Sequence, residues 1–188
     1  MPETRALPLV RWGEALRRRS LLRRRLASAC GALAVLGLVG VLAVPPGPLL
    51  VWNRSASAPV GLYRVSGRHR VAPGDLVIAW APRSARTMAA ARGYVPSGVP
   101  LVKQVAAIEG DRVCAVGETL FVNGKIAAFR QAHDRNGRGL PWWTGCRVLG
   151  PGELLLLMPA SALSFDGRYF GVSQESDVIG RARLIWAR

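Results

Sequence analysis

An uncharged apolar stretch from Leu26 to Val44 is the feature that most constrains how this chain can fold. As a helix, the stretch is about long enough to cross the roughly 30 Å hydrocarbon core of a membrane. Pro45 and Pro46 follow it, and because proline has no backbone N–H to donate, the helix is expected to end there. The stretch therefore predicts one membrane-spanning helix near the N-terminus.

Positive charge before the stretch predicts its orientation. The chain of 188 residues carries a formal charge of +15, and its first 25 residues contain eight Arg and two Glu. Because arginine before a span marks the cytoplasmic side, we expect a basic cytoplasmic tail (1–25), a signal anchor (26–50) and an extracytoplasmic domain (51–188). A cleavable signal peptide is the alternative, since Val41-Leu42-Ala43 satisfies the small-residue rule at a cleavage site. The long leader and the long apolar run favour the anchor.

Short candidate strands separated by turn signals fill the region after the stretch. They cover residues 61–65, 76–80, 101–108, 112–116, 119–122, 154–158 and 178–186. Asn123-Gly124 is the strongest hairpin signal, because both residues accept a positive φ. Residues 84–92 are the one candidate helix of this region. The pattern predicts a mostly β domain.

Two of the three cysteines, Cys114 and Cys146, lie in the part of the chain expected outside the cytoplasm, where a disulfide is allowed. We predict a bridge between them, and two unrelated buried thiols are the alternative. Neither cysteine has histidines at metal-ligand spacing, so we expect no metal and no cofactor. Cys30 falls within the apolar stretch and is interpreted as a small apolar residue.

Lysine is rare in this sequence: 24 of the 26 basic residues are arginine, and only Lys103 and Lys125 are lysine. Lys125 follows the predicted hairpin turn and is interpreted as a solvated residue. Lys103 has apolar neighbours on both sides, and a desolvated lysine can lose its proton near neutral pH and act as a general base. A strand-edge lysine whose ammonium reaches water is the alternative, and for this residue alone it is the more common case.

A candidate nucleophile lies shortly after the apolar stretch. In the segment 53–61, NRSASAPVG, small residues surround the Ser57 hydroxyl and leave room for a substrate backbone. Pro59 and Gly61 would fix an unusual backbone path and place Ser57 on a rigid loop at a strand entrance. The segment alone is a weak signal, because Ser/Ala/Pro linkers after membrane anchors are common.

Three motifs occur in order along the chain: NRSASAPVGLY at 53–63, LVKQVAAIEGD at 101–111 and SFDGRYFG at 164–171. Together they resemble the signal peptidase I superfamily, the Ser/Lys peptidases of family S26, and within it the TraF-type conjugative transfer peptidases. By position, the resemblance implies that Ser57 is the nucleophile and Lys103 its general base. It places the Ser55 hydroxyl in the oxyanion hole with the backbone N–H of Ser57, and Ser164 as the hydroxyl that orients the lysine amine.

The third motif also carries supporting residues. Asp166 and Arg168 match an acid and a base that hold the supporting loop in the family. Gly167 departs from the pattern, because a serine is usual between them. Neither His69 nor His133 is accompanied by a nucleophile-elbow motif, and both are interpreted as surface histidines.

The resemblance implies a signal-peptidase-like β-fold catalytic domain preceded by one transmembrane helix. It implies a serine endopeptidase of the bacterial inner membrane, single-pass, with a cytoplasmic N-terminus and a periplasmic catalytic domain. The expected substrates are exported precursor proteins, above all a conjugative pilin subunit, which some members release as a cyclic product. We expect contact with membrane lipid but no nucleic-acid binding, because the exported arginines are scattered and no recognition motif appears. The alternatives are a housekeeping leader peptidase and a non-catalytic anchored component of a conjugation or secretion channel.

Overall fold

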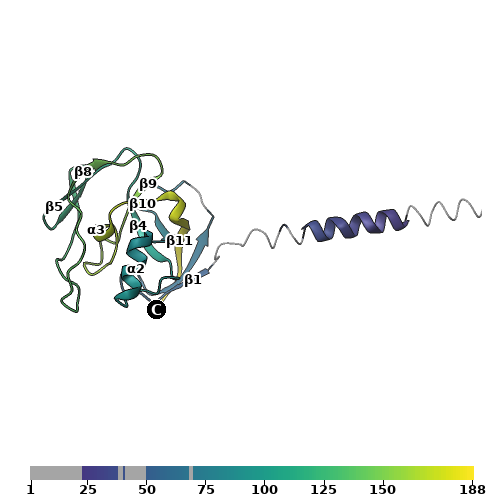
Figure 1. Ribbon diagram of the computed structural model, residues 1–188, viewed down its shortest axis with the longest axis horizontal. Helices are drawn as coiled ribbons and strands as arrows, with labels where there is room; N and C mark the ends of the chain where they lie inside the picture. The colour runs from purple at the N-terminus through teal and green to yellow at the C-terminus, as the bar shows by residue number, and fades with distance from the viewer. Residues whose placement is uncertain (1–22, 38–39, 41–49, 68–69) are drawn as a thin grey trace, which may run out of the picture. The chain divides into compact units, whose positions relative to one another are not determined.

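The computed structural model describes residues 23–37, 40, 50–67 and 70–188. The chain divides into two units, Met1–Pro46 and Gly47–Arg188. In the first unit, residues 23–37 form a helix (Figure 1). Within the described ranges, no helix combines the length and the apolar character needed to cross a membrane. Most of the predicted tail, and residues 38–39 and 41–44 of the predicted span, lie outside the described residues, so both stay predictions.

The second unit is built mainly from antiparallel strands in two sheets. The larger sheet has the order β1-β2-β11-β3-β4-β9-β10, and the smaller has the order β7-β6-β5-β8. In Figure 1, β5 and β8 lie at one end of this unit, whereas β1 and β11 lie at the other. The prediction of a mostly β domain is therefore confirmed. The strands are β1 (Leu50–Asn53), β2 (Gly61–Ser66), β3 (Leu76–Ala79), β4 (Leu101–Ala107), β5 (Arg112–Val116), β6 (Thr119–Val122), β7 (Lys125–Phe129), β8 (Gly145–Val148), β9 (Glu153–Leu157), β10 (Ser173–Gln174) and β11 (Val178–Ala187); the helices are α2 (Arg83–Ala91), α3 (Gly167–Phe170) and the 3₁₀ turn η1 (Glu175–Asp177).

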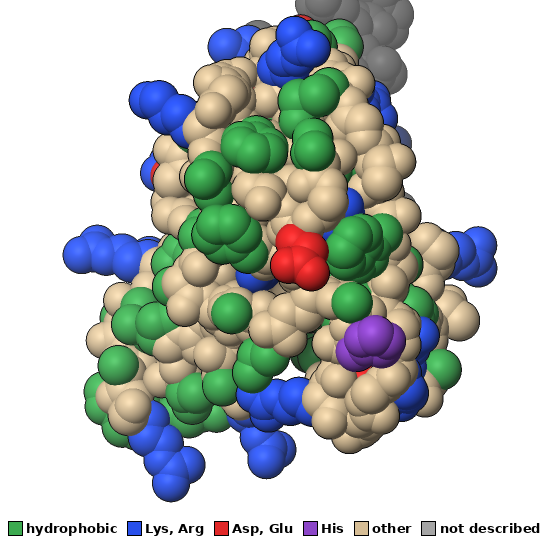
Figure 2. Space-filling model, turned by 90° about the vertical axis from the view of Figure 1, so that its left-hand side faces the viewer, with side chains coloured by type: hydrophobic (Ala, Val, Ile, Leu, Met, Phe, Trp, Pro, Cys, Tyr) green, Lys and Arg blue, Asp and Glu red, His purple; other side chains and the backbone are tan. Residues whose placement is uncertain are grey.

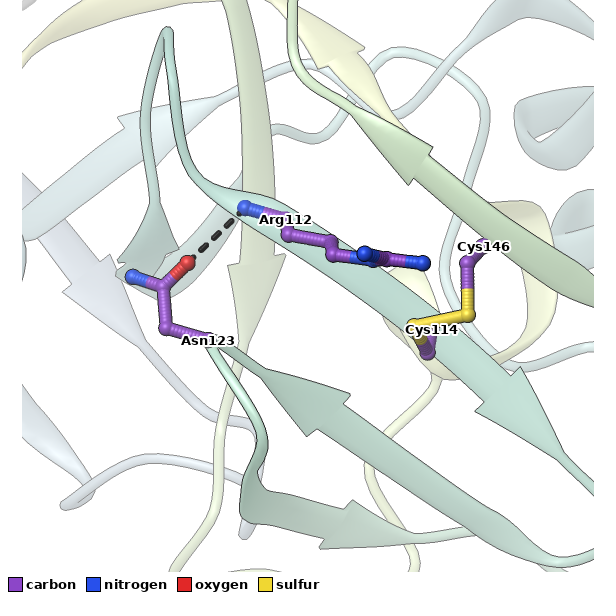
Figure 3. Close-up of a disulfide and its surroundings, with 4 residues drawn as sticks. All are labelled: Arg112, Cys114, Asn123 and Cys146. Carbon is purple, nitrogen blue, oxygen red and sulfur yellow. Dashed lines mark hydrogen bonds between the residues drawn. A yellow bond between two sulfur atoms is a disulfide. The ribbon is translucent and has the colours of Figure 1, made fainter.

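The hairpin between β6 and β7 forms at the predicted Asn-Gly pair. Asn123 and Gly124 have φ values of 51° and 78°, as a tight two-residue hairpin turn requires. The Asn123 side chain also accepts a hydrogen bond from the backbone N–H of Arg112 at 2.9 Å (Figure 3) and donates one to Asp111 at 2.7 Å. One turn residue therefore fixes both the hairpin and the start of β5.

A disulfide joins the two strands at the other side of the smaller sheet. Cys114 in β5 and Cys146 in β8 lie directly opposite each other in the antiparallel register, and their sulfur atoms are bonded (Figure 3). The bond fastens the edge strand β8 to β5.

Hydrophobic side chains remain exposed on the smaller sheet, where Val116, Ile126, Phe129 and Val148 are each more than half exposed. Figure 2 views the unit from the end where β5 and β8 lie, and it shows hydrophobic side chains on this face with Lys and Arg projecting from its margins.

The strand β9 is buried on both of its faces, which explains its uninterrupted run of leucines. Leu155 and Leu157 pack into the core between the two sheets, whereas Leu154 and Leu156 pack with the other core of the larger sheet. Burying one leucine side chain contributes roughly 1.5–3 kcal/mol, so this strand is a strong anchor. Met158 follows it directly, and the candidate site is built on that end of the strand.

Candidate active site

Ser57 lies on a loop, residues 54–60, that connects β1 to β2. The loop is held by the buried side chain of Asn53. Its amide nitrogen donates hydrogen bonds to the carbonyl oxygens of Ser55 (3.0 Å), Ala58 (3.1 Å) and Pro59 (3.1 Å). Its amide oxygen accepts one from the backbone N–H of Ser55 at 3.0 Å. One side chain therefore determines the path of the loop around Ser57.

The end of the loop is fixed by a close approach between two strands. A Cβ atom on Gly61 would lie 2.0 Å from the carbonyl oxygen of Trp186 in β11, so only glycine fits here. The Tyr63 hydroxyl donates a hydrogen bond to the carbonyl oxygen of Pro59 at 2.8 Å. The close approach is the physical reason for the glycine in the first motif, and the tyrosine of the same motif holds the carbonyl group of Pro59.

The hydroxyl groups of Ser55 and Ser57 lie side by side. Their Oγ atoms are 2.8 Å apart, and the backbone N–H of Ser57 donates a hydrogen bond to Ser55 Oγ at 3.3 Å. Ser55 is exposed and Ser57 is half-buried, so a substrate can reach both. A hydroxyl and a backbone N–H this close together can bind one carbonyl oxygen, which is what an oxyanion hole requires.

Lys103 lies in β4, and its side chain is almost completely buried, at 3 % exposure. Its amine donates a hydrogen bond of 2.6 Å to the hydroxyl of Ser164, which is fully buried. Burial lowers the pKa of Lys103 from 10.5 to about 8; the negative charge of Asp166 opposes this shift and the positive charge of Arg168 adds to it. The alternative of a strand-edge lysine that reaches water is therefore wrong. At pH 7 about one Lys103 amine in ten is neutral and can accept a proton.

Behind this lysine lies a buried ion pair between Asp166 and Arg168. The carboxylate accepts hydrogen bonds from Arg168 Nε (2.9 Å) and Nη2 (2.8 Å), and also from the backbone N–H of Met158 (2.9 Å). The guanidinium also donates to the carbonyl oxygens of Phe129 (3.1 Å) and Ser161 (2.6 Å). The pair thus connects β7 and the end of β9 to the loop that carries Ser164, the hydrogen-bond partner of Lys103.

Gly167, the departure from the family pattern, is explained by packing against β9. A Cβ atom here would lie 2.8 Å from both the carbonyl oxygen of Leu156 and a methyl group of Leu155. A serine would therefore need a shift of the strand. The Trp143 indole N–H donates a hydrogen bond to the carbonyl oxygen of Gly167 at 2.9 Å, a contact that the sequence did not predict.

Ser55, Ser57 and Lys103 line one cavity of about 600 Å³. Both Ser57 and Lys103 belong to the described part of the chain, and no hydrogen bond joins their side chains. Hydrogen bonds between groups that exchange a proton often form or tighten only when substrate is bound.

The other residues that line the cavity were not predicted. They come from three loops, residues 92–95, 131–140 and 161–165, and His133 in the second loop is exposed, as expected of a surface histidine. His69 lies outside the described residues.

Comparison with known proteins agrees with the motifs. The model of the family described as signal peptidase, peptidase S26, matches residues 22–187. A conjugal transfer protein TraF of Agrobacterium fabrum is 35% identical over 162 residues, covering 81% of this chain and 86% of its own length. A conjugal transfer protein TraF of Agrobacterium tumefaciens is 31% identical over 172 residues, covering 87% of this chain and 96% of its own length.

Among solved structures, a signal peptidase I from Enterococcus faecalis is similar over 60% of this chain and 97% of its own length, at 17% identity and a TM-score of 0.37. The family model spans all three motifs and both Agrobacterium proteins align over most of their length. The chain therefore belongs to the signal peptidase S26 family and within it resembles the TraF conjugal transfer proteins, as the three motifs predicted.

Proposed function

We propose that this protein is a membrane-anchored serine endopeptidase in which Ser57 is the nucleophile and Lys103 its general base. The observation that carries the proposal is the buried Lys103 amine, whose pKa is lowered to about 8, on the wall of the same cavity as the accessible Ser57 hydroxyl. A lysine with an ordinary pKa would stay protonated and could not take the proton of a serine.

The proposed reaction has two halves. Ser57 Oγ attacks the scissile carbonyl carbon while its proton moves to Lys103 Nζ, and the resulting oxyanion accepts hydrogen bonds from the Ser57 N–H and the Ser55 hydroxyl. The C–N bond then breaks, the Lys103 ammonium gives its proton to the leaving amine, and an ester on Ser57 remains. In the second half, Lys103 takes a proton from a water molecule or an amine that attacks the ester carbonyl, the C–O bond to Ser57 breaks, and the Lys103 ammonium returns the proton to Ser57 Oγ. Ser164 holds the amine in place through its hydrogen bond.

The substrates that we propose are exported precursor proteins, with a conjugative pilin subunit as the principal one. The relatives named conjugal transfer protein TraF support this assignment. If the amino terminus of the pilin attacks the ester in place of water, the product is cyclic. The family description, signal peptidase, favours a second candidate, a housekeeping leader peptidase that acts on many exported proteins.

The proposed location is the bacterial inner membrane, with the N-terminus in the cytoplasm and the catalytic unit in the periplasm. The arginine-rich tail and the apolar stretch 26–44 support this orientation. Protease added to intact spheroplasts should digest the catalytic unit and leave the N-terminal tail protected. Digestion of the tail with a protected catalytic unit would contradict the orientation.

The function is tested by comparing the wild type with Ser57→Ala and Lys103→Ala in processing of the cognate prepilin or of a generic exported precursor. Lys125→Ala is the matched control, because Lys125 is the other lysine of the chain and is exposed. We expect intact precursor to accumulate with both active-site variants, and the mass of the product at each end to identify the bond and any cyclisation. Normal processing by a folded Ser57→Ala or Lys103→Ala variant would remove that residue from the mechanism.

A further inference from the structure

Besides Lys103, three arginines and one aspartate are the charged side chains that line the active-site cavity, and the loops that carry them form one wall. These side chains are Arg92, Arg135, Arg138 and Asp134, from the loops 92–95 and 131–140. A peptide that enters the cavity therefore meets an excess of positive charge besides that of Lys103. A cleft lined by one sign of charge raises the local concentration of ligands of the opposite sign.

Asp134 is fully engaged by hydrogen bonds within the wall. Its carboxylate accepts hydrogen bonds from the Tyr94 hydroxyl, from Arg138 Nε at 2.7 Å, and from the backbone N–H groups of Asn136 and Arg138, both at 2.9 Å. Partial burial would raise the pKa of Asp134, but these hydrogen bonds outweigh it and hold the pKa well below its usual value. The carboxylate is thus the ionised centre of a rigid turn over residues 134–138.

Two of the three arginines are engaged as well. Arg138 donates to Asp134 and, at 3.1 Å, to the carbonyl oxygen of Arg92, and its guanidinium lies 5.5 Å from the ring centre of Tyr94. Arg92 donates to the carbonyl oxygen of Gly139 at 2.8 Å. These contacts join the loops 92–95 and 131–140 into one wall.

Arg135 differs from both. It is exposed, it lines the cavity, and its guanidinium makes no hydrogen bond or ion pair with any residue in the described part of the chain. Its backbone is nevertheless fixed, because it lies between Asp134 and Asn136 in the rigid turn. A guanidinium offers five N–H donors in a planar fork that matches a carboxylate. The wall therefore presents one available arginine from a preorganised backbone.

We propose that Arg135 binds a carboxylate of the peptide substrate close to the scissile bond and is a specificity-determining residue of this enzyme. The carboxylate is either an acidic side chain or the free C-terminal carboxylate of a short leaving peptide. Asp134 acts as a positioning residue, because it holds the turn from which Arg135 projects. The inference rests on the proposed function, which places the scissile bond at Ser57.

Binding of peptides to the full chain carrying Ser57→Ala, in a non-ionic detergent, tests this inference without requiring cleavage. The probes are fluorescent ten-residue Ala/Gln peptides with an amidated C-terminus, in which one Glu, Gln or Lys is moved through each position. A second set contains no Glu and ends in either a free carboxylate or an amide. We expect at least one carboxylate peptide to bind about tenfold more tightly than its neutral counterpart, since a charge-assisted bidentate pair is strong where water is partly excluded.

The added variant Arg135→Gln should abolish this preference, and Arg135→Glu should shift it towards Lys. Arg112→Gln is the matched control, because Arg112 is an exposed arginine of β5 that does not line the cavity, and it should leave the preference intact. A preference among the amidated peptides identifies the carboxylate as an acidic side chain, and a preference for the free C-terminus in the second set identifies it as the terminal carboxylate. Equal binding of all peptides, or a preference that survives Arg135→Gln, would overturn the inference even if the proteolytic function stands. Failure of the proposed function would instead appear as normal processing by Ser57→Ala with its native arginine.

Discussion

The loop that carries Ser57 and the cluster around Lys103 are built in opposite ways. The loop is accessible, and its hydrogen bonds join residues within a few positions of Asn53. The Lys103 cluster is buried, and it joins β4 to Ser164 and the Asp166–Arg168 pair, about 60 residues further along the chain. In the proposed mechanism, the nucleophile must be accessible to a protein substrate, whereas the base must be shielded from water to lose its proton near neutral pH. The two halves of the site should therefore fail differently when they are altered.

The largest effect should come from removing the amine while keeping the shape of its side chain. We expect Lys103→Met to lower kcat/KM by about 10³-fold or more, because Lys103 is the proposed acceptor of the Ser57 proton. The melting temperature should change little, since the loss of the Ser164 hydrogen bond is offset by the loss of a buried ammonium. Precursor cleavage and thermal unfolding measure the two quantities. A variant that keeps a tenth of the wild-type rate would contradict the role of Lys103.

The next effect is on stability, and it compares the loss of a buried ion pair with the loss of a more exposed one. Asp166→Asn should lower the free energy of unfolding by about 3–5 kcal/mol, because the buried Arg168 loses its anionic partner. The matched control is Asp75→Asn, whose partner Arg181 is half exposed; it should cost about 0–1 kcal/mol. Denaturant unfolding of the full chain measures both. Equal losses of unfolding free energy would contradict the expectation that breaking the buried Asp166–Arg168 pair costs more than breaking an exposed pair.

The pH dependence of the reaction should report the Lys103 pKa. Because the neutral amine is the active form, kcat/KM should fall about tenfold per pH unit below pH 8 and level off above it. Stability should change in the same direction: the unfolded chain holds the Lys103 proton up to 10.5 and the folded chain only up to about 8, so stability rises with pH between these values. An activity profile that keeps rising tenfold per pH unit up to pH 10 would refute the lowered pKa.

The smallest effect should come from the accessible loop. Asn53→Ala removes four hydrogen bonds around Ser57 and should destabilise the protein by about 1–3 kcal/mol, with a fall in kcat/KM of about tenfold. Because Lys103 is not touched, the midpoint of the pH profile should stay where it is in the wild type. A shifted midpoint would show that the two halves of the site are coupled more tightly than their hydrogen bonds indicate.

The sequence predicted the parts of the fold that have a clear pattern. The strands β5 and β6 were predicted to the residue, and β3, β4 and α2 to within one residue, because apolar runs and turn signals mark their ends. The elements β8, β10 and α3 were not predicted, because their residues do not form an apolar run between turn signals. Contacts with distant parts of the chain define them, such as the pairing of Cys146 with Cys114.

The candidate site could be predicted only in part, for the same reason. Ser57 and Lys103 follow from the motifs, but the burial that lowers the pKa of Lys103 depends on a loop about 60 residues away. The part of the cavity lining that comes from residues 92–95 and 131–140 was not predicted, because the contact between Tyr94 and Asp134 spans 40 residues. A local signal did exist: the Asp-Arg-Asn-Gly sequence at 134–137 is typical of a turn built around an aspartate. The position of that turn in the cavity was not predictable locally.

The loop that carries Ser57 depends on β11, the last strand of the chain to be synthesised. In β11, Trp186 packs against Gly61 at the end of the nucleophile loop, and the backbone N–H of Arg188 donates a hydrogen bond of 3.0 Å to the carbonyl oxygen of Val60. Ser57 is synthesised early, but this strand emerges more than 100 residues later, and contacts of such long range form late in folding. On the proposed export route, the catalytic unit would therefore cross the membrane before its active site is complete, and the loop that carries Ser57 would reach its final contacts only after the last strand has arrived.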